Sequence, residues 1–477
     1  MDNTPATTCS PTRTTVTFQG ADAPSEEQYL FCIRCGLCLS ACPTYKLSLK
    51  ETDSPRARVT LVRKVMEGEL PLGTGFSQQM YKCLACLACD TICPVGIHPA
   101  SLALAGRALA HEALPQPWFK RPIFRGLFPR PDRLELATLP LRLYSRLGLK
   151  HAVERLGLTR LLPAQLRDME RMLPPLPARP LRQTLPEVTP ARGERKARVG
   201  FFLGCVQSLI FAEGSQAAVR VMAENGCEVV TPREVKCCGM PHVGYGDREA
   251  ARELARHNVD LFEGLGVDVV VTDCATCGST LKEYPELLAP DAAYAKRATA
   301  FAAKVRDVSE FLATLDLREP SQPLHRKVTV HDPCHLVRGQ GVRAQPRQII
   351  ELAGAELVEM RDADVCCGSA GTKILTHYEA STAILDQKMA NVAATGAEVV
   401  AAGCPGCQLH LKLGAQRAGL EIEVCHPVQL LDAAYRAEDP KAALTPLKSN
   451  SPPSPYWGQA GTSPLRARST QRKREET

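Results

Sequence analysis

The sequence predicts a chain of mixed α/β and α+β class, in which an N-terminal helical module is followed by two repeated α/β cysteine-rich domains. Three observations carry this prediction. Two runs of closely spaced cysteines lie near the N-terminus, short apolar segments alternate with helical patterns after residue 196, and the second half repeats its own cysteine spacing. With 477 residues the chain is too long for one compact core, so several domains are expected.

Changes in composition divide the chain into six parts. Both ends are rich in Pro with Thr, Ser or Arg and poor in large apolar residues, so we expect them to be disordered. The predicted parts, in order, are a disordered tail (1–24), a domain with two cysteine runs (25–115), a helical connector (116–195), a first cysteine-rich domain (196–320), a second cysteine-rich domain (325–437) and a disordered basic tail (438–477).

The two cysteine-rich domains are predicted to contain parallel sheets. Their candidate buried strands are the apolar segments 199–202, 269–272, 328–330 and 398–401. Alanine-rich segments with a helical polar pattern lie between them, for example 214–224 and 249–262. Strands that alternate with helices in this way form parallel α/β units.

The two N-terminal runs share the spacing C-x-x-C-x-x-C-x-x-x-C-P. A tight loop can supply three thiolates to a cubane iron–sulfur cluster, and in two-cluster ferredoxins the fourth comes from the other run. The spacing therefore predicts a ferredoxin-like module with two [4Fe–4S] clusters. The predicted metal ligands are Cys32, Cys35, Cys38 and Cys93 for one cluster, and Cys83, Cys86, Cys89 and Cys42 for the other.

Zinc is the alternative occupant of these runs, but zinc sites use pairs of cysteines, often with histidine. We also expect Gly36 to let the backbone approach the sulfurs, and apolar neighbours to shield them from water. These neighbours are Ile33, Leu37, Leu84 and Leu87.

The C-terminal half is an internal repeat. In each copy a cysteine is followed after 31 residues by Cys-Cys-Gly, and then after 35 or 36 residues by Cys-x-x-Cys. Adjacent cysteines suit a multi-iron group better than one small tetrahedral ion, so additional clusters are predicted. A metal-free structural or quinone-handling role and a zinc site are the alternatives. The candidate cofactor ligands are Cys205, Cys237, Cys238, Cys274 and Cys277, and Cys334, Cys366, Cys367, Cys404 and Cys407.

Beyond these spacings, the sequence resembles a known family over roughly Glu26 to Ala434. The repeated element resembles the cysteine-rich domain of heterodisulfide reductase, which implies non-cubane [4Fe–4S] clusters in complete five-cysteine motifs. The order of the parts is similar to that of the glycolate oxidase iron–sulfur subunit. The segments that carry the likeness are Glu51-Thr52-Asp53-Ser54-Pro55-Arg56, Gly204-Cys205, Lys282-Glu283-Tyr284, Cys366-Cys367-Gly368-Ser369-Ala370-Gly371-Thr372 and Gly406-Cys407-Gln408-Leu409-His410-Leu411.

The resemblance implies an iron–sulfur electron-transfer subunit of a glycolate oxidase complex. A separate FAD-containing subunit would oxidise glycolate, or D-lactate, and electrons would pass through this chain to a quinone or another acceptor. The chain has no glycine-rich nucleotide loop, so we expect no catalytic residue for substrate oxidation in it.

Alternatives to this function remain open. Because Cys274 and Cys404 complete both Cys-x-x-Cys motifs, a heterodisulfide-reductase-like subunit is one of them. An iron–sulfur subunit of a D-lactate or glycerol-3-phosphate dehydrogenase is another, and a zinc-binding interaction protein is a third.

Composition argues against several other classes. No stretch approaches eighteen consecutive apolar residues, so no membrane span is expected, and residues 1–10 lack the pattern of a secretory signal. We therefore expect the chain in the cytoplasm, either free or bound peripherally to the inner face of the membrane. The net charge of +7 is diffuse and is accompanied by no nucleic-acid recognition motif.

Some conspicuous residues lie outside the motifs. His242, His335 and His426 are expected to be buried or hydrogen-bonded rather than catalytic, and Arg56 and Arg58 to form ion pairs or face a partner. The cysteines expected to bind no metal are Cys9, Cys227 and Cys425.

Overall fold

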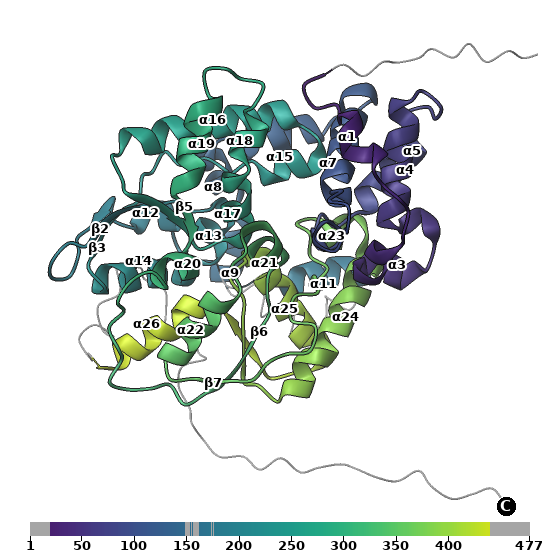
Figure 1. Cartoon of the computed structure of the whole chain (residues 1–477). Coiled ribbons are helices and arrows are strands. Elements are labelled where there is room, and N and C mark those ends of the chain that lie inside the picture. The colour runs from purple at the N-terminus through teal and green to yellow at the C-terminus, as the bar shows by residue number, and fades with distance from the viewer. Residues whose placement is uncertain are drawn as a thin grey trace, which may run out of the picture.

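The computed structural model of the chain describes residues 20–147, 162–172 and 176–438, with residues 153, 155 and 174 between them (Figure 1). Most of the two predicted tails lies outside these residues. Figure 1 shows a helical N-terminal module in purple beside two α/β units in teal and in green to yellow. The predicted fold class is confirmed.

The N-terminal module consists of short helices around the two cysteine loops. Helices α3 and α4 each begin with a proline, directly after Cys42 and Ser54, and the Ser54 hydroxyl accepts a hydrogen bond from the Ala57 N–H at 3.1 Å. Apolar faces of α4, α5 and α7 form its core. The elements are α1 (Glu26–Leu30), α2 (Leu37–Ala41), α3 (Pro43–Ser48), η1 (Glu51–Asp53), α4 (Pro55–Met66), α5 (Thr74–Lys82), α6 (Ala88–Thr91) and α7 (Pro99–Ala113).

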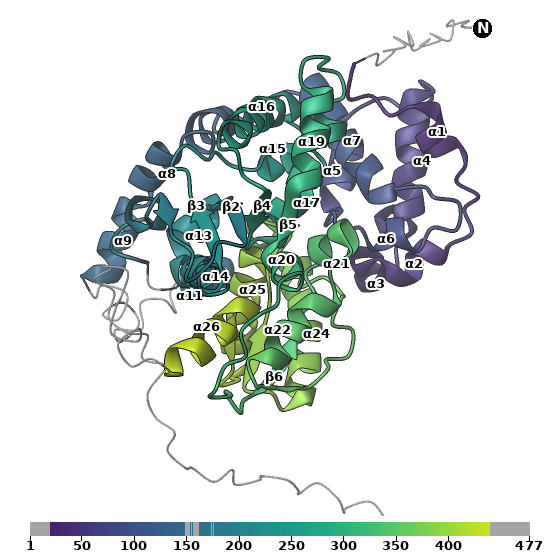
Figure 2. The ribbon, with the colours of Figure 1, turned by 60° about the vertical axis from the view of Figure 1, so that its left-hand side comes forward.

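The predicted connector forms helices that lie along both α/β units (Figure 2). Arg182 pairs with Glu135 at 2.7 Å, and Asp168 pairs with Arg417 of the second repeat at 2.6 Å. An amphipathic piece predicted within 140–162 is helical up to residue 146, and most of its remainder lies outside the described residues. The elements are η2 (Pro122–Leu127), α8 (Pro131–Ala137), α9 (Leu139–Arg146), α11 (Ala164–Met172) and α12 (Leu181–Thr184).

Two sheets with the same strand order form the α/β units. The first has the order β1-β3-β2-β4-β5 and the second β7-β6-β8-β9, with every pair parallel except β1 with β3. All four predicted strand segments overlap β2, β4, β6 or β8. The strands are β1 (Val188–Thr189), β2 (Ala197–Phe201), β3 (Cys227–Val230), β4 (Val269–Thr272), β5 (Val305–Asp307), β6 (Lys327–Val330), β7 (Glu356–Leu357), β8 (Val399–Ala401) and β9 (Glu423–Cys425).

Helices connect and cover these strands, and α14 and α16 contain the two segments predicted as helical. In the first repeat they are α13 (Cys205–Ile210), α14 (Ala212–Glu224), α15 (Met240–Tyr245), α16 (Arg248–Gly264), α17 (Ala275–Lys282), α18 (Tyr284–Leu287), α19 (Ala295–Lys304) and α20 (Val308–Leu312). In the second they are α21 (Cys334–Gln340), α22 (Ala344–Leu352), α23 (Lys373–Thr376), α24 (Tyr378–Thr395), α25 (Pro405–Ala418) and α26 (Pro427–Glu438).

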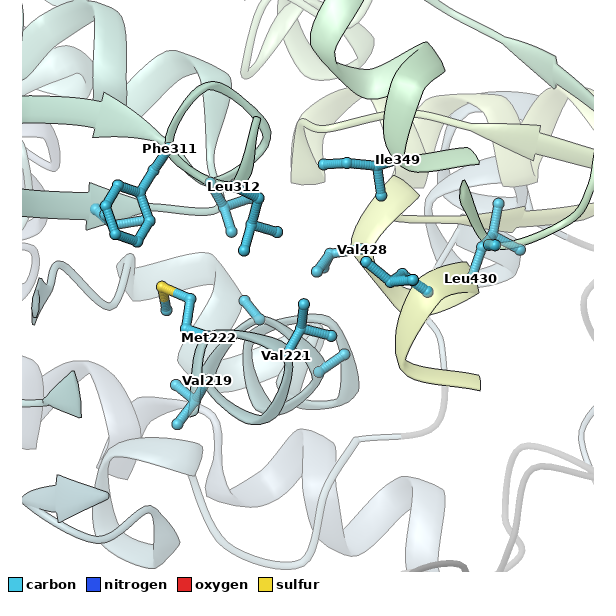
Figure 3. Close-up of a cluster of buried hydrophobic side chains, with 14 of the residues drawn as sticks. Val219, Val221, Met222, Phe311, Leu312, Ile349, Val428 and Leu430 are labelled. Atoms are coloured by element: carbon cyan, nitrogen blue, oxygen red, sulfur yellow. The ribbon is translucent and has the colours of Figure 1, made fainter. Parts of the chain in front are cut away.

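The two repeats share one apolar core. Figure 3 shows Val221 of α14 and Leu312 of the first repeat beside Ile349 and Val428 of the second. All four side chains are at most 1% exposed. Burial of a side chain of this size contributes about 1.5–3 kcal/mol, so the shared core holds the repeats in one arrangement.

The N-terminal module is anchored to the first repeat where α7 crosses α15. Arg107 donates to the Gly244 carbonyl at 2.9 Å, and the Tyr81 hydroxyl donates to the Tyr245 carbonyl at 2.8 Å. Gly246 ends α15 with a φ of +86°, and a Cβ there would overlap the backbone carbonyl of Arg107. Only glycine therefore permits this close crossing.

Gly246→Ala is expected to lower the free energy of unfolding by about 2–4 kcal/mol, because it adds a backbone clash to an unfavourable φ. Gly244→Ala is the matched control, since a Cβ at Gly244 would meet nothing within 4 Å. Chemical denaturation of both variants measures the difference. Equal stabilities would show that α7 and α15 cross more loosely than these contacts indicate.

Candidate iron–sulfur sites

The first cysteine run forms an exposed loop, which we call the outer ferredoxin site with its predicted ligands Cys32, Cys35, Cys38 and Cys93. Cys35 is exposed and the other three are half-buried. Burial raises the pKa of the Cys38 thiol, and the neighbouring Cys32 and Cys35 raise it further. Cys93 packs against the same apolar cluster as Cys32. This arrangement brings the three loop cysteines together.

The second run forms the inner ferredoxin site with its predicted ligands Cys83, Cys86, Cys89 and Cys42, all of them buried. Its loop repeats the backbone of the first, because Ala85 and Leu87 have positive φ at the positions that Arg34 and Gly36 occupy in the outer site. Two runs of one sequence pattern thus adopt one conformation, with Leu84 buried beside the inner site.

The neighbourhood of Arg58 supports the crossed ligand set of the inner site. Its Nη1 lies 4.0 Å from the Cys42 sulfur. Burial, the largest influence, lowers the pKa of the guanidinium, but the nearby Cys83, Cys42 and Cys89 thiols raise it above its ordinary value. One guanidinium therefore lies close to Cys42 of the first run and to two cysteines of the second.

The two arginines singled out in the sequence have different roles. Arg56 forms the expected ion pair, with its Nε 2.7 Å from Glu51. Arg58 is 2% exposed and donates to the Gln79 carbonyl at 3.2 Å and the Thr44 hydroxyl at 3.1 Å. It therefore lies beneath the inner site, and it neither forms an ion pair with a described residue nor faces a partner.

Each repeat gathers its five predicted ligands at the carboxyl end of its sheet, where open α/β sheets bind ligands. Cys205 and Cys334 begin α13 and α21 after the first strand of each repeat, and Cys274 and Cys404 follow β4 and β8. The glycines after the paired cysteines, Gly239 and Gly368, have φ of +97° and +90°. We call these groups the first-repeat site and the second-repeat site.

The thiols of the two repeat sites form one continuous row. The Cys367 and Cys407 sulfurs are 3.4 Å apart, and each neighbouring pair along the row perturbs the pKa of its members through side-chain interactions. The order is Cys205, Cys237, Cys238, Cys277, Cys274, Cys404, Cys407, Cys367, Cys366 and Cys334.

The two repeats meet in the middle of this row. The Thr276 hydroxyl lies 3.4 Å from the Cys404 sulfur, and the Ala275 N–H donates to the Gly403 carbonyl at 2.9 Å. Gln340 of α21 donates to the Ala275 carbonyl at 2.9 Å. Hydrogen bonds to the backbone therefore hold the two Cys-x-x-Cys motifs together.

The far end of the row touches the inner ferredoxin site. Cys86 packs in one apolar cluster with Cys366 and Ile384, and Cys334 lies against the same cluster. Burial, followed by the charge of Cys366, raises the pKa of the Cys86 thiol. The inner site is thus adjacent to the second repeat.

The chemistry of these groups fits iron–sulfur clusters. All twenty described cysteines are free thiols, and soft thiolate ligands select Fe–S clusters, zinc or Cu(I). Burial raises the pKa of the Cys89 thiol, and hydrogen bonding to Cys366, followed by burial, raises that of Cys334. Metal loading would therefore release protons. An unpartnered buried imidazole, His331, lies beside Cys367 and Cys407.

The remaining conspicuous residues are structural. The His242 ring bonds to the Phe124 carbonyl at 2.7 Å, and the His426 ring accepts from the Val428 N–H at 3.2 Å. His335 is charge-coupled to the buried Glu283 carboxyl. Cys227 and Cys425 pack in the shared apolar core, and Cys9 lies outside the described residues.

Sequence reasoning missed three polar residues that surround the second-repeat site: His331, Lys388 and His410. Alignment of the two copies at positions other than cysteine could have found them, since the first copy has Phe202, Asn258 and Thr280 there. In the part of the chain that the structure describes, no helix is long and apolar enough to cross a membrane.

Comparisons with known proteins agree with this architecture. The family described as 4Fe-4S dicluster domain matches residues 28–97, the glycolate oxidase iron-sulfur subunit linker region matches 115–173, and the cysteine-rich domain matches 199–282 and 328–412. All three predicted components are therefore present in the predicted order.

Whole proteins match as well. The "Probable glycolate oxidase iron-sulfur subunit" of Bacillus subtilis is 37% identical over 88% of this chain and 96% of its own. The "Glycolate oxidase iron-sulfur subunit" of Escherichia coli is 29% identical over 85% and 94%. A fumarate reductase (CoM/CoB) chain of Methanothermobacter marburgensis is 36% identical over 50% and 47%. This chain belongs to the glycolate oxidase iron–sulfur subunit family.

Proposed function

We propose that this chain carries electrons from an FAD-containing subunit that oxidises glycolate to a quinone or another acceptor. Its crossed cysteine sets hold two [4Fe–4S] clusters, and its repeats hold two further clusters. The domain boundaries are those predicted from the sequence, and the complex works in the cytoplasm or on the inner face of the membrane. Bound clusters supply one-electron oxidation and reduction.

The observation that carries this proposal is the linear order of the four sites. Cys86 of the inner ferredoxin site lies against Cys366, and Cys404 of the second repeat interacts with Cys274 of the first. The order is therefore outer ferredoxin, inner ferredoxin, second repeat, first repeat. The second repeat precedes the first, although it follows it in the sequence.

The exposed outer site is the proposed entry point. The apolar residues beside it that were expected to shield it lie at the surface, with Ile33 65% and Leu37 50% exposed, and Phe31 is 64% exposed. Exposed apolar side chains around an exposed redox site fit the docking face of a protein partner. The flavin subunit is the proposed partner.

The first-repeat site is the proposed exit. A narrow pocket beneath the connector reaches Cys205 and Cys237 and is bordered by Phe128 and Leu134. The connector therefore covers the last site of the series and would control access of an acceptor to it.

The test is anaerobic purification of the tagged chain with its natural partners, followed by addition of substrate. Glycolate is expected to bleach the iron–sulfur absorbance, whereas D-lactate and glycerol 3-phosphate leave it unchanged. Bleaching by one of the other substrates alone would retain electron transfer and reject glycolate. No bleaching by any of them would reject the proposal.

A heterodisulfide-reductase-like activity is the second candidate. Both five-cysteine motifs are complete, and the matched half of the chain is similar to part of a fumarate reductase that is named for CoM and CoB. A spectral change on addition of a disulfide or dithiol, in the absence of any response to glycolate, would favour this candidate.

A further inference from the structure

The two repeat sites have the same frame but different polar surroundings. Phe202 and His331 occupy one structural position, because their N–H groups donate to equivalent carbonyls of the next strand, Val271 at 2.8 Å and Ala401 at 2.9 Å. Asn258 and Lys388 are likewise equivalent, on α16 and α24, and each precedes the first cysteine of its Cys-x-x-Cys motif by 16 residues.

The second-repeat site is lined by buried nitrogen donors. His331 is 0% exposed, and neither ring nitrogen has a hydrogen-bond partner among the described residues. A ring nitrogen lies within 4.8 Å of the Cys367 and Cys407 sulfurs. An imidazole N–H so placed has only the cysteine site to bond, since an unpaired buried donor is costly.

Lys388 adds a cationic group to this site. It is 2% exposed, and its Nζ donates to the carbonyls of Asp362 and Ala363, the latter at 3.3 Å. Burial lowers the pKa of this ammonium group, and the charges of Cys367 and Cys366 are the largest influences that oppose the lowering. A buried ammonium group with sulfurs as its nearest anionic partners is retained for charge, because an apolar residue would fill the space at lower cost.

The first-repeat site has neutral groups at both positions. Phe202 is apolar and fully buried. The Asn258 amide donates to the Cys237 carbonyl at 3.2 Å and to the Tyr284 hydroxyl at 3.1 Å. The imidazole that lies near Cys238, His242, has its Nε2 bonded to the Phe124 carbonyl at 2.7 Å.

These differences act in one direction. Reduction adds a negative charge to a site, and a nearby cation or N–H donor stabilises that charge most strongly where water is excluded. Hydrogen bonds and net charge around the sulfurs set the potential of an iron–sulfur site. We propose, on the basis of the proposed function, that the second-repeat site has the higher reduction potential, and that His331 and Lys388 are positioning residues that set it.

The order of reduction follows from this difference. The second-repeat site, which receives electrons from the inner ferredoxin site, fills before the first-repeat site. An electron is therefore retained in the middle of the series until a second one arrives, which suits an acceptor that takes two electrons.

The experiment is a reductive titration of the full chain, followed by electron paramagnetic resonance and combined with iron analysis. Lys388→Asn and His331→Phe introduce the residues of the first copy, and Lys388→Met is a second variant that keeps the apolar stem. Each is expected to shift the reduced-to-oxidised ratio of one repeat signal at least tenfold toward the oxidised form, about 59 mV for one electron. Iron content is expected to stay unchanged.

The matched control is Lys412→Asn on α25, because this half-buried lysine contacts the Phe211 ring at 5.2 Å and belongs to neither site. It is expected to shift no repeat signal. Unchanged potentials in all Lys388 and His331 variants at full iron content would overturn the inference alone. A count of about eight irons in the unmodified chain, instead of about sixteen for four sites, would overturn cluster binding by the repeats and the inference with it.

Discussion

Cys42→Ser and Cys93→Ser are each expected to remove one cluster of the ferredoxin module, about four irons, and to lower electron transfer from glycolate to the acceptor more than about 100-fold. The reason is the series arrangement, in which the loss of either ferredoxin site leaves no route to the repeats. Cys42 is buried next to Arg58 and near Cys83, whereas Cys93 packs beside Cys32.

The crossed ligand sets make this prediction more specific. Cys93→Ser is expected to give the electron paramagnetic resonance spectrum of Cys35→Ser, and Cys42→Ser that of Cys86→Ser. If each run held its own cluster, the pairing would be reversed. Cys227→Ala is the control, because Cys227 is buried in the shared apolar core and should leave the iron content unchanged.

Arg58→Met is expected to lower the free energy of unfolding by about 3–5 kcal/mol, because it leaves buried polar groups without their charged donor. The affected acceptors are the Gln79 carbonyl and the Thr44 hydroxyl. Removal of a guanidinium 4.0 Å from the Cys42 sulfur is also expected to lower the reduction potential of the inner ferredoxin site.

Denaturation and redox titration measure the two effects separately. Arg63→Met is the matched control on the same helix, since Arg63 is 36% exposed and pairs with Glu67 at the surface. It should change neither the melting temperature nor the potential. An Arg58→Met chain that keeps its stability but loses potential would assign Arg58 to redox tuning alone, and the reverse would make it purely structural.

Most of the fold was predictable because its signals are local. The strands β2, β4, β6 and β8 are short apolar runs, and a run that is buried on both faces must be apolar at every position. The repeat was predictable from cysteine spacing, since equal spacing places equal ligands at the ends of equal strands. The role of Arg58 was not predictable, because Arg56 and Arg58 are both arginines of α4 and differ only in the face of the helix on which they lie.

The sequence by itself determined the components: two ferredoxin runs, two five-cysteine repeats and their order along the chain. Only the tertiary structure decided how they connect. Cys86 meets Cys366 rather than a cysteine of the first repeat, and Cys274 meets Cys404, because packing of the shared core and of α6 against α21 sets these distances. The physical reason is that ligand spacing depends on a few consecutive residues, whereas the contacts between sites depend on surfaces that are hundreds of residues apart in the chain.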